Sequence, residues 1–200
     1  MLDAKESNME SLYFEEKSFD KNDFGKSPLK RGEYEKCRFN SCNFYNSDIS
    51  EIKFVDCSFT ACDLSMVKVR ETVFNIIKFS DCKILGVRFD NCNNFGFAVG
   101  FENCILDHSS FFKKKIRKTV FQNSKLIEVD FTDSDLSNSV FLECDLTRTL
   151  FKNTSLEGAD FRTSFNFSID PDINKIKKAK FSIFGLPGLL EKYNVEIENK

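Results

Sequence analysis

The hydrophobic residues of the chain recur every five positions. Every fifth residue is apolar from Phe14 to Phe89, and after a shift of two residues the same spacing holds from Phe101 to Phe161. A period of five fits neither the α-helix, at about 3.6 residues per turn, nor the β-strand, at about 2. The chain must therefore turn about once in every five residues throughout this stretch.

A second restricted position lies two residues before each of these large apolar residues. In the first stretch it holds small or β-branched side chains, for example Cys42, Ser47, Ile52, Cys57 and Cys62. The other three positions carry nearly all the charged residues and asparagines. We therefore expect a large inward position and a small inward position in every five residues, with a turn at each corner. Four such units make a solenoid coil of about 20 residues with four short faces.

The repeat resembles the pentapeptide repeat family, whose consensus reads approximately A(D/N)LXX. It stands here as CDLSM at 62–66, SDLSN at 134–138 and ADFRT at 159–163. The resemblance covers about three quarters of the chain and implies an all-β fold, a right-handed quadrilateral β-helix. At the usual spacing of about 4.8 Å, about eight coils would form a rod roughly 40 Å long.

The repeat divides the chain into three parts. Residues 1–13 lack it and are expected to be a frayed N-terminal segment, and residues 14–165 are expected to form the β-helix, with a register slip near 93–100. Residues 166–200 form a C-terminal segment in which Leu186, Leu189, Leu190 and Tyr193 have the spacing of a short amphipathic helix. Val195 and Ile197 then alternate as in a strand.

The open end of a solenoid must be covered. The C-terminal segment is therefore expected to be a cap, a homodimer contact through Leu186, Leu189, Leu190 and Tyr193, or both. Within the family, the chain resembles the Qnr, MfpA and McbG type, and proteins of the Qnr and MfpA type dimerise through a C-terminal module after the last coil. The resemblance thus favours a homodimer.

The buried positions account for two unusual features of the composition, 24 Phe and 8 Cys. Phe121, Phe131, Phe141, Phe151 and Phe161 are expected to stack in the core of the second stretch. All the cysteines occupy the small inward position, without the short paired spacings of metal sites, so we expect them to be buried free thiols. No cofactor, metal or redox role is assigned.

Two features depart from the repeat. The slip across residues 93–100 contains two glycines and predicts a bulge that re-aims the coil or a small recognition loop. Lys114 falls on a small inward position, so its side chain should snorkel to solvent or the coil should bulge there. It belongs to the basic run 113–118, KKKIRK, which is either a solvated face or a contact for a phosphate or a partner.

Composition and charge exclude several function classes. The chain is 41% hydrophobic and 30% charged with a net charge of -2, which is typical of a folded soluble protein and not of a basic nucleic-acid binder. The acidic residues near the N-terminus are unlike a secretory signal, so a cytoplasmic location is expected. The single histidine, His108, is expected to face outward, and no catalytic motif occurs. We therefore expect a protein that is not an enzyme.

The resemblance also implies a function. The best-known members of the family are described as rods of duplex-DNA-like width and negative charge that bind DNA gyrase or topoisomerase IV and protect it from quinolones or gyrase poisons. The candidate surface for such DNA mimicry is an acidic patch made of Glu128, Asp130, Asp133, Asp135, Glu143 and Asp145. The alternative is a structural or interaction scaffold for another protein partner.

The 20-residue coil predicts which charges stack on one another. Opposite charges one coil apart outnumber like charges; examples are Arg31 with Glu51, Glu33 with Lys53, Lys113 with Asp133, Lys115 with Asp135, Lys125 with Asp145, and Glu128 with Arg148. Cross-strand pairs of this kind are worth about 0.2–1 kcal/mol each. This pattern favours a surface of ion pairs over a polyanion, and with it the scaffold.

Overall fold

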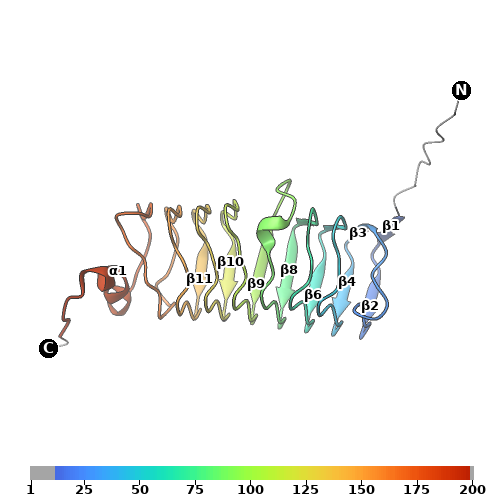
Figure 1. Ribbon diagram of the computed structural model, residues 1–200, viewed down its shortest axis with the longest axis horizontal. Helices are drawn as coiled ribbons and strands as arrows, with labels where there is room; N and C mark the ends of the chain where they lie inside the picture. The colour runs from blue at the N-terminus through green and yellow to red at the C-terminus, as the bar shows by residue number, and fades with distance from the viewer. Residues whose placement is uncertain (1–11, 199–200) are drawn as a thin grey trace, which may run out of the picture.

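The computed structural model describes residues 12–198, which form a rod-shaped right-handed quadrilateral β-helix of about seven turns (Figure 1). The predicted fold class is confirmed. The strands of the rod are β1 Leu12–Glu15, β2 Ser18–Asp20, β3 Gly32–Glu35, β4 Arg38–Asn40, β5 Lys53–Val55, β6 Ser58–Thr60, β7 Val73–Asn75, β8 Ile77–Ser80, β9 Val99–Glu102, β10 Val120–Gln122 and β11 Val140–Leu142. The short helices are η1 Phe89–Asn91, η2 Ile183–Gly185, α1 Pro187–Leu190 and η3 Glu191–Tyr193.

The strands pair in parallel along two faces of the rod. One sheet has the order β1-β3-β5-β7, and the other has the order β11-β10-β9-β8-β6-β4-β2. Partners lie one coil apart in the sequence, as in the pair Phe39 and Phe59; across the slip Phe79 pairs with Phe101. The predicted coil length and the two-residue shift are therefore both observed.

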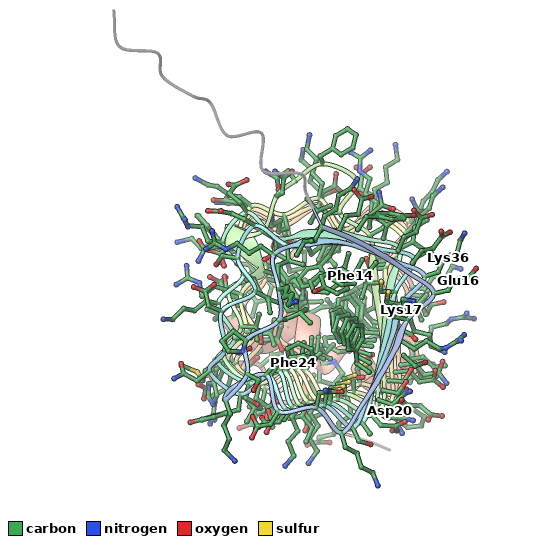
Figure 2. The ribbon with its side chains drawn as sticks, turned by 90° about the vertical axis from the view of Figure 1, so that its right-hand side faces the viewer. Phe14, Glu16, Lys17, Asp20, Phe24 and Lys36 are labelled. Carbon is green, nitrogen blue, oxygen red and sulfur yellow. The ribbon has the colours of Figure 1, made fainter. Side chains whose placement is uncertain are left out.

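The corners of the coil require a left-handed residue two positions after most large inward residues. Glu16, Lys36 and Asp56 have φ angles of 53°, 51° and 51°. The N–H of this residue donates to the next coil, as from Lys36 to the Val55 carbonyl at 2.9 Å. Figure 2, a view along the rod axis, shows Glu16, Lys17 and Lys36 at one corner of a square cross-section. The turn that the period of five demands is thus a single left-handed residue.

The Asp or Asn of the repeat closes the same turn. In the CDLSM unit, the Asp63 carboxylate accepts a hydrogen bond from the Ser65 N–H at 2.9 Å. Asn43 accepts one from the Tyr45 N–H at 3.0 Å. Since a carboxylate or an amide oxygen fills this role equally, the consensus allows both residues.

Stacked phenylalanines fill the centre of the rod, as expected. Phe121, Phe141 and Phe161 form one column with ring centroids 4.9 Å and 4.7 Å apart, and Phe131 and Phe151 belong to another with centroids 5.5 Å apart. Rings of adjacent columns meet edge to face, which is a favoured aromatic geometry. All these side chains are buried.

Polar side chains at the small inward position form hydrogen bonds in addition to filling the site. The Cys57 thiol donates to the Tyr34 carbonyl, and the hydroxyls of Thr154 and Ser164 donate to carbonyls in the same way. Cys, Ser and Thr therefore supply a donor to the preceding coil while filling a narrow site. All eight cysteines are free and buried, as predicted.

The stack extends beyond the predicted end of the repeat. Lys175 and Lys180 form bridges with residues of the previous coil, and Ile169, Asn174 and Ala179 continue the small inward register. Asn174 is buried and donates to the Phe151 carbonyl at 2.9 Å. The last coil was missed because the large inward pattern is broken by Asn166 and Pro171.

The C-terminal segment crosses the end of this last coil. Helix α1 is short, as predicted, and it approaches the coil so closely that a Cβ at Gly188 would lie 2.2 Å from the Phe167 carbonyl oxygen. The Ile169 N–H donates to the Gly188 carbonyl at 2.9 Å. Residues 195–198 are irregular, so the strand expected around Val195 and Ile197 is not present.

At the other end, Leu12 and Tyr13 lie in β1 and pair with β3. They belong to the β-helix although they were expected in the frayed segment. The rest of that segment, residues 1–11, lies outside the described residues.

Candidate functional site

The register slip forms a loop that interrupts one face of the rod. After η1, Asn93 and Asn94 lead out of the coil, and Phe95 is 80% exposed at the tip. The loop returns at Ala98, whose N–H donates to the Phe74 carbonyl at 3.0 Å. The sheet β1-β3-β5-β7 ends at this point, and the loop stands out from the rod beside β8 and β9 (Figure 1).

Lys114 is buried beneath this loop. Its side chain is 2% exposed, and its Nζ donates to the Cys92 carbonyl at 2.5 Å and to Asn94 Oδ1 at 2.8 Å. The Phe97 ring lies below the ammonium, with 5.0 Å between Nζ and the ring centroid. The expectation that Lys114 snorkels is wrong; the bulge that accommodates it lies in the preceding coil.

The Lys114 ammonium replaces a hydrogen bond that the slip removes. In neighbouring units the backbone N–H groups of Ile105 and Ser110 donate to the carbonyls of Cys82 and Val87. At the corresponding place the Cys92 carbonyl receives Lys114 Nζ instead. Burial lowers the pKa of Lys114, because desolvation disfavours the charged form. The two departures from the repeat are therefore one structural feature.

One corner of the rod, which we call the Ile76 corner, is hollowed on both sides of the slip. It is the column of corner residues Glu16, Lys36, Asp56, Ile76, Ala98 and Lys118. A hollow of about 550 Å³ extends along it over four coils, between residues 36–38 and 98–100. A second hollow, of about 360 Å³, lies between residues 97–99 and 115–119. Ala98 and Val99 line both hollows.

The predicted acidic patch is not gathered on one face. The coil places Glu143 and Asp145 at one corner, Glu128 and Asp130 at the next, and Asp133 and Asp135 at a third. This arrangement follows from the period of five, because acidic residues close together in sequence pass around the rod.

Several carboxylates of the patch are used by the fold. Asp130, Asp135 and Asp145 each accept the N–H of the residue two positions on, as Asp63 does. Although burial acts in the opposite direction, hydrogen bonds from Ser137 and the ion pair with Arg117 lower the pKa of Asp135. Asp133 and Glu143 make no ion pair among residues 12–198.

The stacked charges are paired in only some of the predicted places. Arg31 with Glu51, Glu33 with Lys53, and Glu128 with Arg148 are within 3.0 Å. Lys113, Lys115 and Lys125 form no ion pair with the carboxylates predicted for them, and Arg117 reaches Asp135 instead at 2.6 Å. Long side chains therefore bridge between coils diagonally as well as directly.

The end of the rod leaves an apolar surface. Only Leu189 of the four predicted dimerisation residues packs against the core, while Leu186, Leu190 and Tyr193 are exposed. Phe184 is 90% exposed beside them, and Ile183 is also exposed. A hollow of about 440 Å³ lined by Phe167, Leu190, Val195 and Ile197 lies on the same surface.

The sequence contains one histidine. His108 faces outward and pairs with Glu128 at 3.1 Å, as expected for a surface histidine. Residues 12–198 hold no group of three or more Cys, His, Asp or Glu that could bind a metal ion. They also contain no helix with the length and apolar character needed to cross a bilayer.

Comparison with known proteins agrees with the fold. The family model described as "Pentapeptide repeat region" matches residues 32–96 and 94–165. A trypsin-treated form of QnrB1, a plasmid-mediated fluoroquinolone resistance protein, is 18% identical, with a TM-score of 0.61, over 94% of this chain and 100% of that one. Full-length QnrB1 is 16% identical, with a TM-score of 0.62, over 92% and 100%. No curated protein sequence matches.

Proposed function

Because the chain belongs to the pentapeptide repeat family, we propose that it is a non-enzymatic rod that binds another protein, and that this partner is DNA gyrase or topoisomerase IV, which it protects from quinolones. The observation that carries the proposal is the likeness to QnrB1, a fluoroquinolone resistance protein, over nearly the whole of both chains. The acidic patch would then supply the DNA-like charge.

The experiment is a gyrase supercoiling assay, and a parallel topoisomerase IV assay, with and without ciprofloxacin. Addition of the purified protein is expected to restore activity that the drug inhibits. A variant with Asp130, Asp133, Asp135 and Asp145 all changed to Asn should lose this protection. The fold should survive, because an asparagine oxygen closes the same turn at Asn43.

The same variant distinguishes mimicry from other binding modes. Exposed charges are screened within about 10 Å at 0.1 M salt, so binding through DNA-like charge should weaken steeply as salt increases. Protection that is unchanged in the four-Asn variant would contradict a role for the acidic patch. Absence of any effect on both topoisomerases would contradict the topoisomerase proposal.

A scaffold for a different protein is the second candidate. It is favoured by the distribution of the patch over three corners and by the carboxylates that the fold already uses. Glu128 is also paired with Arg148 at 2.6 Å, so its charge is partly neutralised. A scaffold would leave both topoisomerase assays unchanged while the protein remains folded.

We further propose that the chain acts as a homodimer joined through the C-terminal segment. The exposed side chains of Ile183, Phe184, Leu186, Leu190 and Tyr193 form an apolar end surface of the kind that marks a protein contact. Light scattering should give the mass of a dimer for the full chain and of a monomer for Phe184→Asp. Phe95→Asp, at another highly exposed phenylalanine on the loop, is the matched control and should stay dimeric. A monomeric parent protein would refute the dimer.

A further inference from the structure

The Ile76 corner carries an apolar residue where the fold disfavours one. Ile76 has a φ angle of 57° and is the only β-branched residue among the left-handed positions of residues 12–198. Left-handed backbone is costly for a β-branched side chain. Ile76 is also 63% exposed, so burial gives little compensation. An exposed, strained isoleucine is therefore a candidate contact residue.

The hollows beside Ile76 form an open groove along the rod. The residues that follow on the next coil are small: Ala98, then Val99 and Gly100. A Cβ added at Gly100 would have its nearest neighbour, the Val120 carbonyl oxygen, 3.9 Å away, so space is left above it. The floor of the groove is therefore apolar, and it leaves room for the backbone of a ligand to approach.

Cations line both hollows. Lys36, Arg38 and Lys78 border the larger hollow, and Lys115, Arg117 and Lys118 border the smaller one. Asp56 is the one carboxylate among the lining residues of the two hollows. Lys36, Lys78 and Arg117 are paired with carboxylates outside the groove. Arg38, Lys115 and Lys118 form no ion pair among residues 12–198, so their charge is available to a ligand.

From this arrangement we propose that the Ile76 corner binds an extended, acidic polypeptide segment of a partner protein. Between Lys36 and Lys118 the column spans four coil steps, about 19 Å, which matches about six extended residues. Apolar side chains of the segment contact Ile76 and the space above Gly100, and its carboxylates contact Arg38, Lys115 and Lys118. The free cations and the apolar floor both fit such a segment.

A nucleic acid fits this groove less well. Its backbone carries a phosphate at every residue, and the strand would pass Asp56 and the carboxylates of Glu15 and Glu102, which hold Lys36 and Lys78. A polypeptide can place neutral side chains at those points. The inference rests on the proposed function only in that the chain binds proteins, and it needs neither a topoisomerase nor the acidic patch.

The test is a fluorescence anisotropy titration of the full-length protein. The probe is a fluorescein-labelled peptide in which every second residue is glutamate and the others alternate valine and serine. A peptide with lysine in place of glutamate and a labelled single-stranded oligonucleotide are titrated in parallel. We expect saturable binding of the acidic peptide that weakens as the salt concentration is raised. The lysine peptide and the oligonucleotide should both bind less tightly than the acidic peptide.

Three variants locate the binding. Arg38→Glu combined with Lys118→Glu should weaken peptide binding about tenfold or more. Gly100→Phe should do the same by filling the groove without changing charge. Lys152→Glu, an exposed cation away from the groove, is the matched control and should change affinity less than about twofold.

Ile76→Asn separates a role of Ile76 in peptide binding from a role in stability. Asparagine adopts the left-handed conformation readily, so this variant should bind the peptide more weakly while its denaturation midpoint does not fall. No saturable binding of the acidic peptide, tighter binding of the oligonucleotide, or equal loss in Lys152→Glu and the double variant would each overturn the proposal. Since no topoisomerase is present, these outcomes are independent of the supercoiling assays.

Discussion

Replacement of Lys114 by methionine tests whether the buried ammonium holds the interrupted coil together. Methionine keeps the unbranched shape of the side chain and its contact with Phe97, but it removes the donor to the Cys92 carbonyl and to Asn94 Oδ1. Hydrogen bonds to a charged group are worth about 1.5–3 kcal/mol each, and a buried carbonyl left without a donor costs about 1–3 kcal/mol.

An opposing contribution reduces this loss. Burial of the ammonium costs free energy, as the lowered pKa of Lys114 indicates, and methionine removes that cost, which is several kcal/mol for a buried ion. We therefore expect a net destabilisation of about 2 kcal/mol, less than the sum of the lost hydrogen bonds. In a chain of this size that corresponds to a fall in Tm of roughly 4–8 °C.

The assay is urea unfolding followed by circular dichroism, with Lys115→Met as the matched control. Lys115 is the neighbouring residue, it is exposed, and it has no ion pair among residues 12–198, so its replacement should change stability by less than about 0.5 kcal/mol. A double-mutant cycle with Asn94→Ala should give a coupling of about 0.5–3 kcal/mol. A Lys114→Met protein as stable as the parent, or no coupling to Asn94, would refute this account.

Three further predictions follow from the core and the corners. Phe131→Ala should cost about 3–5 kcal/mol because its ring is fully buried, whereas Phe112→Ala, one residue out of register and half-buried, should cost about 1 kcal/mol; equal losses in urea unfolding would contradict the register. Burial raises the pKa of Cys42 to about 11 and of Cys57 and Cys144 to about 12. The buried, protonated thiols therefore stabilise the fold fully below about pH 9, and this contribution is lost as the pH rises towards the raised pKa values. The free energy of unfolding should therefore fall by about 1 kcal/mol per thiol by about pH 10, and Cys57→Ser, whose hydroxyl can replace the thiol as donor to Tyr34, should reduce the fall. Ile76→Asn should raise stability by about 0.5–1 kcal/mol by relieving the left-handed isoleucine, and a lower urea midpoint would be the contrary result.

The period of five was sufficient to predict the coil, its core and the place of every cysteine. A left-handed residue at most corners is the main local event needed, and it recurs with the repeat. The reason for the cysteines was not visible in the sequence, because the acceptors of their thiols are carbonyls one coil away, such as Tyr34 for Cys57. Burial alone was expected, whereas several cysteines also donate a hydrogen bond from this position.

The candidate site was predicted less completely. The link between the loop and Lys114 could have been found, since Asn94 lies one coil length before Lys114 in the sequence. The charge pairs could be predicted only in part, because the period fixes Cα positions but not the direction of long side chains. Arg117 reaches Asp135 and Arg70 reaches Glu51, both diagonally. The groove was not predicted either, because the repeat pattern says which residues share a column but not where a hollow lies between their side chains.

The size of the slip explains why an irregular site can exist in this fold without destroying it. Successive side chains of a strand point to opposite faces, so a shift of one residue would turn the phenylalanines outward, whereas a shift of two restores Phe101 above Phe79. Two residues are therefore the smallest insertion that preserves the core. The two inserted residues disturb one corner and remove one backbone hydrogen bond. The ammonium of Lys114, on the following coil, replaces that bond. Within residues 14–165 the slip is the one change of register, so it distinguishes a single position along the rod for a binding partner.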